Sequence, residues 1–321
     1  LETAGSRLAA VKAQYGSQAI AGLITARCSN EDLYLFQKFM RTVIGTNHLD
    51  SSARYGHLNF VHAMNRALGI HRMMNTSEEI NKAKAFLIIG ANITETNPVA
   101  SLRVKSAISL YKAQTIVVDS VQTNIAKLGS HPIMVNPGTE GLYIQALVKS
   151  VIHQDLIDEE ATDAHPAAQT ALKQATESYT LEDVSQQTGV DVEQIHETAR
   201  IFAEAPRSII ICGEGILRQA NGYQHMLQLI DLAWVTGKLG KKGCGINTFT
   251  EEANEQGAVD MGVAPELLPG ATPYADAKKR DTFNQAWGTH LPNDQQGSHL
   301  TDILDRCRNG EIKALYVVGE N

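Results

Sequence analysis

Short apolar runs of strand length recur along the chain and alternate with longer segments whose apolar residues repeat at helical spacing. Strands separated by helices at intervals of about 30 residues are typical of a parallel, doubly wound α/β sheet. The predicted strands are Ala19–Thr25, Phe86–Ile89, Thr115–Val118, Pro132–Val135, Ser208–Ile211 and Ala314–Val318. Ligands bind such sheets at the carboxyl ends of strands, so the loops after these runs are the first candidates for a site.

Helical spacing and capping residues predict the helices that surround these strands. They are Ala4–Gln14, Glu31–Val43, Asn59–Leu68, Pro98–Tyr111, Thr123–Leu128, Glu140–Ile152, Asp191–Ala203 and Gly222–Thr236. Asn30 is the predicted N-cap of the second helix, and Gly45 its predicted end. The polar segment Gln154–Thr180 predicts a surface excursion. The stretch from Asn247 to about Lys279 predicts irregular structure.

Two stretches echo each other: Ala85–Asn92 reads AFLIIGAN, and Ala314–Asn321 reads ALYVVGEN. A third strand is followed by Gly213-Glu-Gly215. A glycine after a buried strand lets backbone N–H groups approach a ligand, and a following helix start favours an anion. These loops therefore predict phosphate sites for an extended ligand or more than one nucleotide. Because the second copy stops where the chain stops and no initiator Met is present, we expect a fragment of a longer protein.

Composition narrows the function. The chain has 321 residues, 43% of them apolar, and a net charge of −7, which argues against nucleic-acid binding. No apolar run reaches membrane-spanning length, so no direct membrane insertion is expected. The four cysteines form no C-x-x-C pair, so neither a zinc nor an iron–sulfur site is predicted within this chain. An acidic cluster follows Asn247, and we interpret it as a solvated loop with a cation site as the alternative; it comprises Glu251, Glu252, Glu255 and Asp260.

Two acidic positions leave alternatives open. The G-x-G-x-x-G fingerprint is absent after the strand that ends at Ile89, which disfavours an ordinary NAD-binding unit. Asp119 ends the next strand and fits either a ribose or base contact or a simple turn. Glu140 closes the string Asn136-Pro-Gly-Thr-Glu and fits either a purine edge or the first turn of a capped helix.

Three blocks of sequence resemble the catalytic subunits of the molybdopterin oxidoreductase family, especially formate dehydrogenases. The large iron–sulfur subunit of NADH:quinone oxidoreductases, in the same family, is an equally near relative. The blocks are Ala26–Asn47; Ile89–Pro98 with Val117–Asp119 and Pro137–Thr139; and Thr236–Gly240 with Asn254–Gly262 and Leu268–Gly270. The resemblance implies two doubly wound parallel-sheet (Rossmann-like) domains, one inserted in the other. Residues 1–52 and 251–321 would form one, and residues 53–250 the inserted nucleotide-binding domain.

The family binds two molybdopterin guanine dinucleotides around Mo or W. By resemblance, Gly90, Asn92, Glu95 and Pro98 line one nucleotide's phosphates. Asp119 and the turn Pro137, Gly138, Thr139 and Glu140 recognise its ribose and guanine. The pterins would lie near Gly213, Gly215, Gln256 and Gly257, and the second nucleotide near Gly319, Glu320 and Asn321. Iron–sulfur clusters would lie outside this fragment.

The sequence departs from the formate dehydrogenases at the residues that would contact the metal and the substrate. Their metal-ligating Cys or Sec is replaced by Gly56, although the following His57 is retained. Their substrate-binding Arg is replaced by Thr250, which cannot form a bidentate pair with a carboxylate. No protein ligand to a metal is therefore expected.

The departures predict part of an NADH-linked electron-transfer complex with partner subunits in the cytoplasm. Any attachment to the inner face of a membrane would run through those partners. The alternatives are an active Mo/W formate dehydrogenase, with oxygen or sulfide in place of the missing ligand, and a structural subunit that binds no pterin.

Overall fold

The computed structural model describes residues 1–292 and 297–320, and the chain divides into two compact units. The first unit comprises residues 1–58 and 252–321, and the second comprises residues 59–251. Each unit is built around its own parallel sheet. The chain therefore has the mixed α/β, parallel-sheet fold that its sequence predicts.

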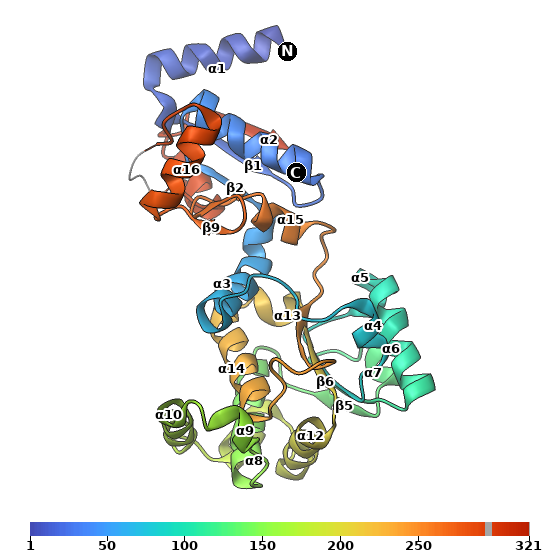
Figure 1. The fold of residues 1–321 in the computed structure, drawn as a ribbon. Coiled ribbons are helices and arrows are strands. Elements are labelled where there is room, and N and C mark those ends of the chain that lie inside the picture. Colours follow the sequence, from blue (N-terminus) through green and yellow to red (C-terminus); the bar gives the residue numbers. More distant parts are fainter. Residues whose placement is uncertain (293–296, 321) are drawn as a thin grey trace. The chain divides into compact units, whose positions relative to one another are not determined.

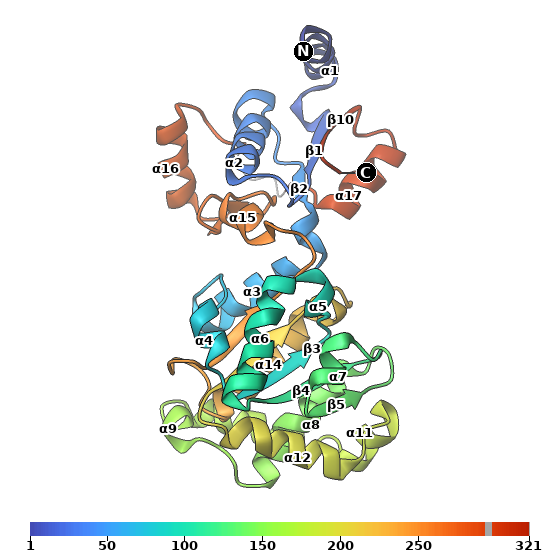
Figure 2. The same ribbon diagram turned by 90° about the vertical axis from the view of Figure 1, so that its right-hand side faces the viewer.

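The sheet of the first unit has three parallel strands in the order β10-β1-β2. Figure 2 shows α2 and α17 on either side of β1, and separate apolar clusters fill the two faces. The elements of this unit are α1 (Glu2–Tyr15), η1 (Ser17–Ala19), β1 (Ile20–Ile24), α2 (Asn30–Lys38), η2 (Phe39–Ile44), β2 (Leu49–Ser51), η3 (Ser52–Tyr55), α15 (Glu255–Asp260), β8 (Leu267–Leu268), β9 (Thr272–Pro273), α16 (Ala277–Trp287), α17 (Leu300–Arg308) and β10 (Ala314–Val318).

The sheet of the second unit has five parallel strands in the order β5-β4-β3-β6-β7. Figure 1 shows α6 and α7 on one side of these strands and α8 and α14 on the other. The elements are α3 (His57–Leu68), which begins in the first unit, α4 (Ser77–Asn81), β3 (Ala85–Ile89), α5 (Ile93–Thr96), α6 (Pro98–Tyr111), β4 (Gln114–Asp119), α7 (Asn124–Leu128), β5 (His131–Met134), α8 (Glu140–His153), α9 (Glu159–Thr162), α10 (Pro166–Thr176), α11 (Leu181–Thr188), α12 (Val192–Glu204), β6 (Ser208–Cys212), α13 (Glu214–Leu217), α14 (Gly222–Val235) and β7 (Gly245–Thr248).

The strand order of the second unit creates a switch point at its centre. From β3 the chain proceeds to β4 and β5 on one side, whereas β6 and β7 are added on the other. All five residues of β3 are buried, and its neighbours pair with it in register from Ala85 to Ile89. The carboxyl ends of β3 and β6 therefore lie side by side at the position where doubly wound sheets hold their ligands.

Two local predictions are corrected by the structure, and a third is confirmed. Asn30 is not the N-cap of α2, because the hydroxyl of Ser29 accepts the N–H of Asp32 and Asn30 is already helical. The segment Gln154–Thr180 contains α9 and α10 and most of its residues are exposed or half-buried, which confirms the predicted surface excursion. The stretch from Asn247 to about Lys279 is not irregular throughout, because it contains α15 and the short antiparallel pair β8 and β9.

Candidate functional site

A cavity of about 190 Å³ lies at the carboxyl edge of the sheet in the second unit. It is formed by the loops that follow β3, β4 and β6 and by the segment after β7. Four predicted site residues line it: Gly90, Asn92, Asp119 and Gly215. Residues far apart in the sequence are thus gathered at the switch point of the sheet.

The glycines of this site bring two loops into backbone contact. Gly90 has a left-handed φ of 57°, and its carbonyl accepts the N–H of Gly215 at 2.9 Å. A Cβ built on Gly213 would lie 2.4 Å from the oxygen of Gly90, and one on Gly215 2.9 Å from its Cα. The absence of side chains therefore serves the contact between the β3 and β6 loops, a role that the sequence pattern did not indicate.

Backbone donors remain available beside these glycines. The N–H groups of Ala91 and Asn92 have no acceptor within the described part of the chain. The Asn92 side chain is held in place because its Oδ1 accepts the hydroxyl of Thr94 at 3.1 Å. Two neighbouring N–H groups at the end of a buried strand suit an anion such as a phosphate.

Two carboxylates lie near each other, at the end of β4 and the start of α8; Asp119 lines the cavity, and Glu140 is buried beside it. Burial raises the pKa of Asp119, and the nearby Glu140 raises it further, although the N–H of Val121 donates to its Oδ1 at 3.2 Å. Glu140 is buried at the first position of α8, and its Oε2 accepts the side-chain amide of Gln219 at 2.9 Å. Such carboxylates are suited to accept hydrogen bonds from hydroxyl and amide N–H groups of a ligand.

The same cavity carries further negative charge, from Glu214, which the sequence analysis did not single out, and from Glu251, which it assigned to a solvated acidic cluster. Glu214 and Glu251 line it, and both contact the guanidinium of Arg218. Burial raises the pKa of Glu214, while the N–H of Glu251 donates to its Oε1 at 2.9 Å. Because the cavity walls are acidic, any phosphate here has to be held mainly by backbone N–H groups.

Some predicted residues lie beside the cavity, not in its wall. Glu95 and Pro98 are exposed at the starts of α5 and α6. Pro137 and Gly138 are exposed too, and Thr139 donates from both its N–H and its hydroxyl to the oxygen of Asn136. This turn positions Glu140 and leaves its own outer face open.

The first unit gathers a second set around α15. The ring Nε2 of His57 lies 3.2 Å from Oε1 of Gln256, whose amide donates to Asp260 at 2.9 Å. Burial lowers the pKa of His57 to about 4, so the ring is neutral at physiological pH. Gly56 is the buried residue immediately before this histidine, between η3 and α3.

The acidic stretch around α15 is structured, which corrects its interpretation as a solvated loop. Glu255 is only 4% exposed, and Glu252 accepts the hydroxyl of Ser52 and lies 3.5 Å from Arg27. Within residues 1–292 and 297–320, no group of three or more His, Cys, Asp or Glu side chains is arranged to hold a metal ion. These carboxylates serve contacts within the protein.

Two further predicted glycines pack closely in the first unit. A Cβ on Gly257 would lie 2.1 Å from the side-chain oxygen of Asn254, and one on Gly319 2.6 Å from Thr25. Glu320 follows at the end of β10 and lies near enough to Cys28 to raise its pKa, after burial and Asp32. The predicted Asn321 lies outside the described residues.

Comparison with known proteins identifies the family. The sequence profile of the molybdopterin oxidoreductases matches residues 1–321. The chain belongs to the molybdopterin oxidoreductase family. Membership implies a molybdopterin cofactor carrying Mo or W, and the resemblance drawn from the sequence blocks is confirmed.

Several curated molybdopterin oxidoreductases align with almost the whole chain. The F420-dependent formate dehydrogenase subunit alpha of Methanocaldococcus jannaschii is 36% identical over 297 residues, covering 92% of this chain and 43% of that protein. Formate dehydrogenase H of Escherichia coli is 31% identical over 322 residues, covering 100% and 45%. NADPH-Fe(3+) oxidoreductase subunit alpha of Geobacter sulfurreducens is 31% identical over 317 residues, covering 99% and 37%. The chain thus spans less than half the length of these relatives.

A solved structure supports the fold. Acetylene hydratase from Pelobacter acetylenicus superposes with a TM-score of 0.65 at 20% identity, covering 75% of this chain and 32% of that one. At this identity the likeness concerns the fold alone. None of the described helices of the present chain combines the length and apolar character needed to cross a membrane.

The residues at the switch point offer contacts for a phosphate and for hydroxyl or amide N–H groups. Unpaired N–H groups at Ala91 and Asn92 suit a phosphate, and Asp119 and Glu140 suit a ribose or a base. The sequence analysis missed Gln219, which links the two sides by donating to Glu140 and to the oxygen of Gly215 at 2.8 Å. Its only sequence signal is a position one helical turn after Gly215, which is too common to be informative.

Proposed function

We propose that the second unit holds the guanine-nucleotide end of a molybdopterin guanine dinucleotide. In this proposal Gly90, Asn92, Glu95 and Pro98 surround the phosphates, while Asp119 and the turn ending at Glu140 bind the ribose and guanine. The support is the pair of unpaired N–H groups and the carboxylate of Asp119 in one cavity at the switch point, with the carboxylate of Glu140 nearby. A guanine edge presents two neighbouring N–H donors, which a fixed carboxylate accepts well.

A second dinucleotide belongs to the same proposal. Gly319, Glu320 and Asn321 would begin the loop for its nucleotide, and the pterins would lie near Gly213, Gly215, Gln256 and Gly257. When bound, the pterin-held Mo or W supplies the electron-transfer chemistry. This chain's own residues bind and orient the cofactor, and the neutral ring of His57 beside Gln256 offers a polar contact without adding charge.

We further propose that the parent protein is a subunit of an NADH-linked electron-transfer complex and does not oxidise formate. The observation that carries this is Gly56, which offers the metal no side chain directly before the retained His57–Gln256 pair. Thr250 is buried and its carbonyl accepts the side chain of Asn97, so no guanidinium stands at that position to hold a carboxylate. A relative named as an NADPH-linked oxidoreductase subunit is consistent with this proposal.

The test uses the full-length protein purified with its partner subunits. Mo and W are measured by mass spectrometry, guanine nucleotide by chromatography after acid release, and activity as dye reduction with NADH or formate. We expect guanine nucleotide with Mo or W, NADH-dependent turnover and no formate-dependent turnover. Formate turnover with stoichiometric metal would overturn the proposal in favour of an active formate dehydrogenase.

That active enzyme is the second candidate, because the chain is 36% identical to a formate dehydrogenase subunit. In it, oxygen or sulfide would replace the missing protein ligand. A third outcome, in which neither guanine nucleotide nor metal is found, would instead indicate a structural subunit. The three readings thus give three different results in one set of measurements.

Variants locate the nucleotide. Glu140→Gln keeps the shape but removes the charge, and we expect it to lower retained guanine nucleotide at least tenfold, the equivalent of about 1–3 kcal/mol for a charge-assisted hydrogen bond. Glu193→Gln, on the exposed face of α12, is the matched control and should retain the wild-type amount. Equal nucleotide in both variants would remove Glu140 from the site.

A further inference from the structure

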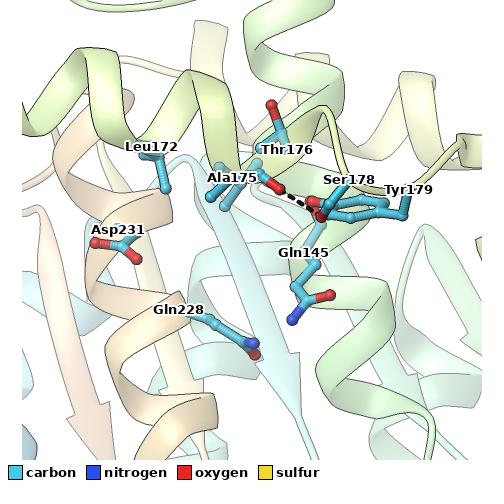
Figure 3. Close-up of a pocket in the computed structure, with 9 residues that line it drawn as sticks. Gln145, Leu172, Ala175, Thr176, Ser178, Tyr179, Gln228 and Asp231 are labelled. Carbon is cyan, nitrogen blue, oxygen red and sulfur yellow. Dashed lines mark hydrogen bonds between the residues drawn. The ribbon is translucent and has the colours of Figure 1, made fainter.

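A second cavity in the same unit lies away from the switch point. It has a volume of about 250 Å³ and is bounded by α8, α10 and α14 and by the turn that follows α10. Figure 3 shows the side chains of Gln145, Gln228 and Asp231 on the two helices that flank it, with Leu172 above. None of its lining residues belongs to the candidate nucleotide site.

Two side chains on one wall of this cavity carry hydrogen-bond acceptors without partners. Asp231 makes no ion pair or hydrogen bond with any residue that the structure describes. The amide oxygen of Gln228 is buried and likewise accepts no hydrogen bond from the described residues. The two residues are three positions apart on α14, so they point to the same side of the helix. A buried acceptor without a donor is costly, which makes this wall a place where a donor would bind.

The rim of the cavity is fixed by its own contacts. Lys149 donates to the carbonyls of Thr176, at 2.6 Å, and Tyr179, and its ammonium lies 5.0 Å from the centre of the Tyr179 ring. The hydroxyl of Tyr179 in turn donates to the carbonyl of Gln145 at 2.9 Å. This buried cation is therefore engaged with the turn, and none of the described residues that line the cavity is basic. These contacts fix the rim of the cavity, and Asp231 is the charged side chain in its lining.

The remaining wall is apolar, formed by Val148, Leu172 and Ala175. A ligand that satisfies both walls needs a cationic donor group at one end and a short hydrocarbon at the other. We propose that this cavity binds a small organic cation, namely a guanidinium or primary ammonium group on a short alkyl chain. Its volume lies below the range of about 300–1,000 Å³ typical of drug-sized ligands, which limits the occupant to a small molecule.

The direct test compares two probes of nearly identical shape. Butylguanidine carries a charge and butylurea does not, and both are titrated into the full chain by isothermal calorimetry. We expect butylguanidine to bind at least tenfold more tightly than butylurea. Equal affinity for the two probes would overturn the proposal. So would the absence of butylguanidine binding when the probe is at millimolar concentration and in tenfold molar excess over the protein.

Variants assign the binding to this cavity. Asp231→Asn removes the charge without changing the shape and should weaken butylguanidine binding at least tenfold. Glu182→Gln, on the exposed face of α11, is the matched control and should bind as the wild type does. Ala175→Leu fills the apolar wall and should weaken both probes while near-UV circular dichroism stays native. Unchanged binding in Asp231→Asn would place the site elsewhere and refute the assignment.

The pH dependence gives an independent readout. Burial alone raises the pKa of Asp231 to about 6. The charged or titratable groups on the elements packed around it do not shift it; they are Lys149 on α8, Lys173 on α10, Glu159 and Glu160 on α9, and His165 before α10. Butylguanidine affinity should therefore fall about tenfold between pH 7 and pH 5, as the carboxylate protonates. A flat profile would contradict the role of Asp231, and none of these results depends on the proposed cofactor.

Discussion

Arg41 is a fully buried cation whose guanidinium holds together the first unit. It donates five hydrogen bonds between 2.7 and 3.0 Å, and none of its hydrogen-bond partners is a carboxylate. The acceptors are the side chains of Gln37 and Asn47 and the carbonyls of Gly262, Ala264 and Leu267. Burial lowers the pKa of Arg41 to about 10, so it remains charged at physiological pH.

Replacing this residue, as Arg41→Met, keeps most of the apolar stem but removes the guanidinium donor from five buried oxygens, of which that of Ala264 still accepts the N–H of Leu267. Each unsatisfied acceptor costs about 1–3 kcal/mol, partly offset because no guanidinium has to be buried. Breaking a buried charged network costs about 3–5 kcal/mol in comparable cases, and we expect a loss in that range. With a urea m-value of about 2 kcal/mol/M, the unfolding midpoint should fall by about 2 M.

The two tryptophans allow each unit to be monitored separately. Trp287 lies in the first unit and donates to the hydroxyl of Tyr34, whereas Trp234 lies in the second unit and donates to the carbonyl of Ala161. Urea unfolding is followed by fluorescence in a Trp234→Phe background for the first unit and in a Trp287→Phe background for the second.

The control for this prediction is Arg308→Met, because Arg308 is 80% exposed on α17 and its surface ion pair contributes little. The control should shift the Trp287 midpoint by less than about 0.3 M, which corresponds to about 0.5 kcal/mol. A shift for Arg41→Met no larger than the control's would refute the role assigned to the buried network.

Three further changes give distinct expectations. Burial, followed by the charge of Arg306, lowers the pKa of His48 from 6.5 to about 4, so the unfolded chain takes up a proton at a higher pH than the folded chain does. The free energy of unfolding reported by Trp287 should therefore fall by up to about 3 kcal/mol as the pH is lowered from 6.5 to 4. His48→Asn should make this pH dependence shallower. Gly213→Ala should lower the Trp234 midpoint by the equivalent of about 1–3 kcal/mol, because its Cβ would lie 2.4 Å from a backbone oxygen; an unchanged midpoint would show that the loop gives way freely. Gly56→Cys alone should produce no formate-dependent dye reduction while Thr250 is unchanged, and measurable turnover would contradict the importance given to the absent guanidinium.

The sequence predicted the elements whose signals are local. The helix Pro98–Tyr111 and the strand Ala314–Val318 appear with the predicted bounds, because a proline at the first helical turn and a continuous apolar run are unambiguous. The strand Gly245–Thr248 was missed, since a glycine-rich run looks like a loop and only pairing with β6 makes it a strand. Helix α16 was also missed, because its sequence is polar and buries no residue fully.

For the candidate site, too, the sequence predicted the residues with a local signal and missed those positioned by packing. Gly90 and Asp119 could be proposed from their place after apolar runs, and both line the cavity at the switch point. Gln219 and Arg218 could not be proposed from the sequence. Their partners depend on how α13 packs, and no spacing in the sequence indicates that packing. The acidic character of the cavity follows from the same long-range placement of Glu214.

The contact between the β3 and β6 loops has a mechanical consequence. Because the carbonyl of Gly90 receives the Gly215 amide, and neither glycine has room for even a methyl group, the two loops cannot be displaced independently. The β3 and β6 loops thus form one connected unit at the centre of the sheet. We therefore expect a ligand that displaces the β3 loop to move the β6 loop with it.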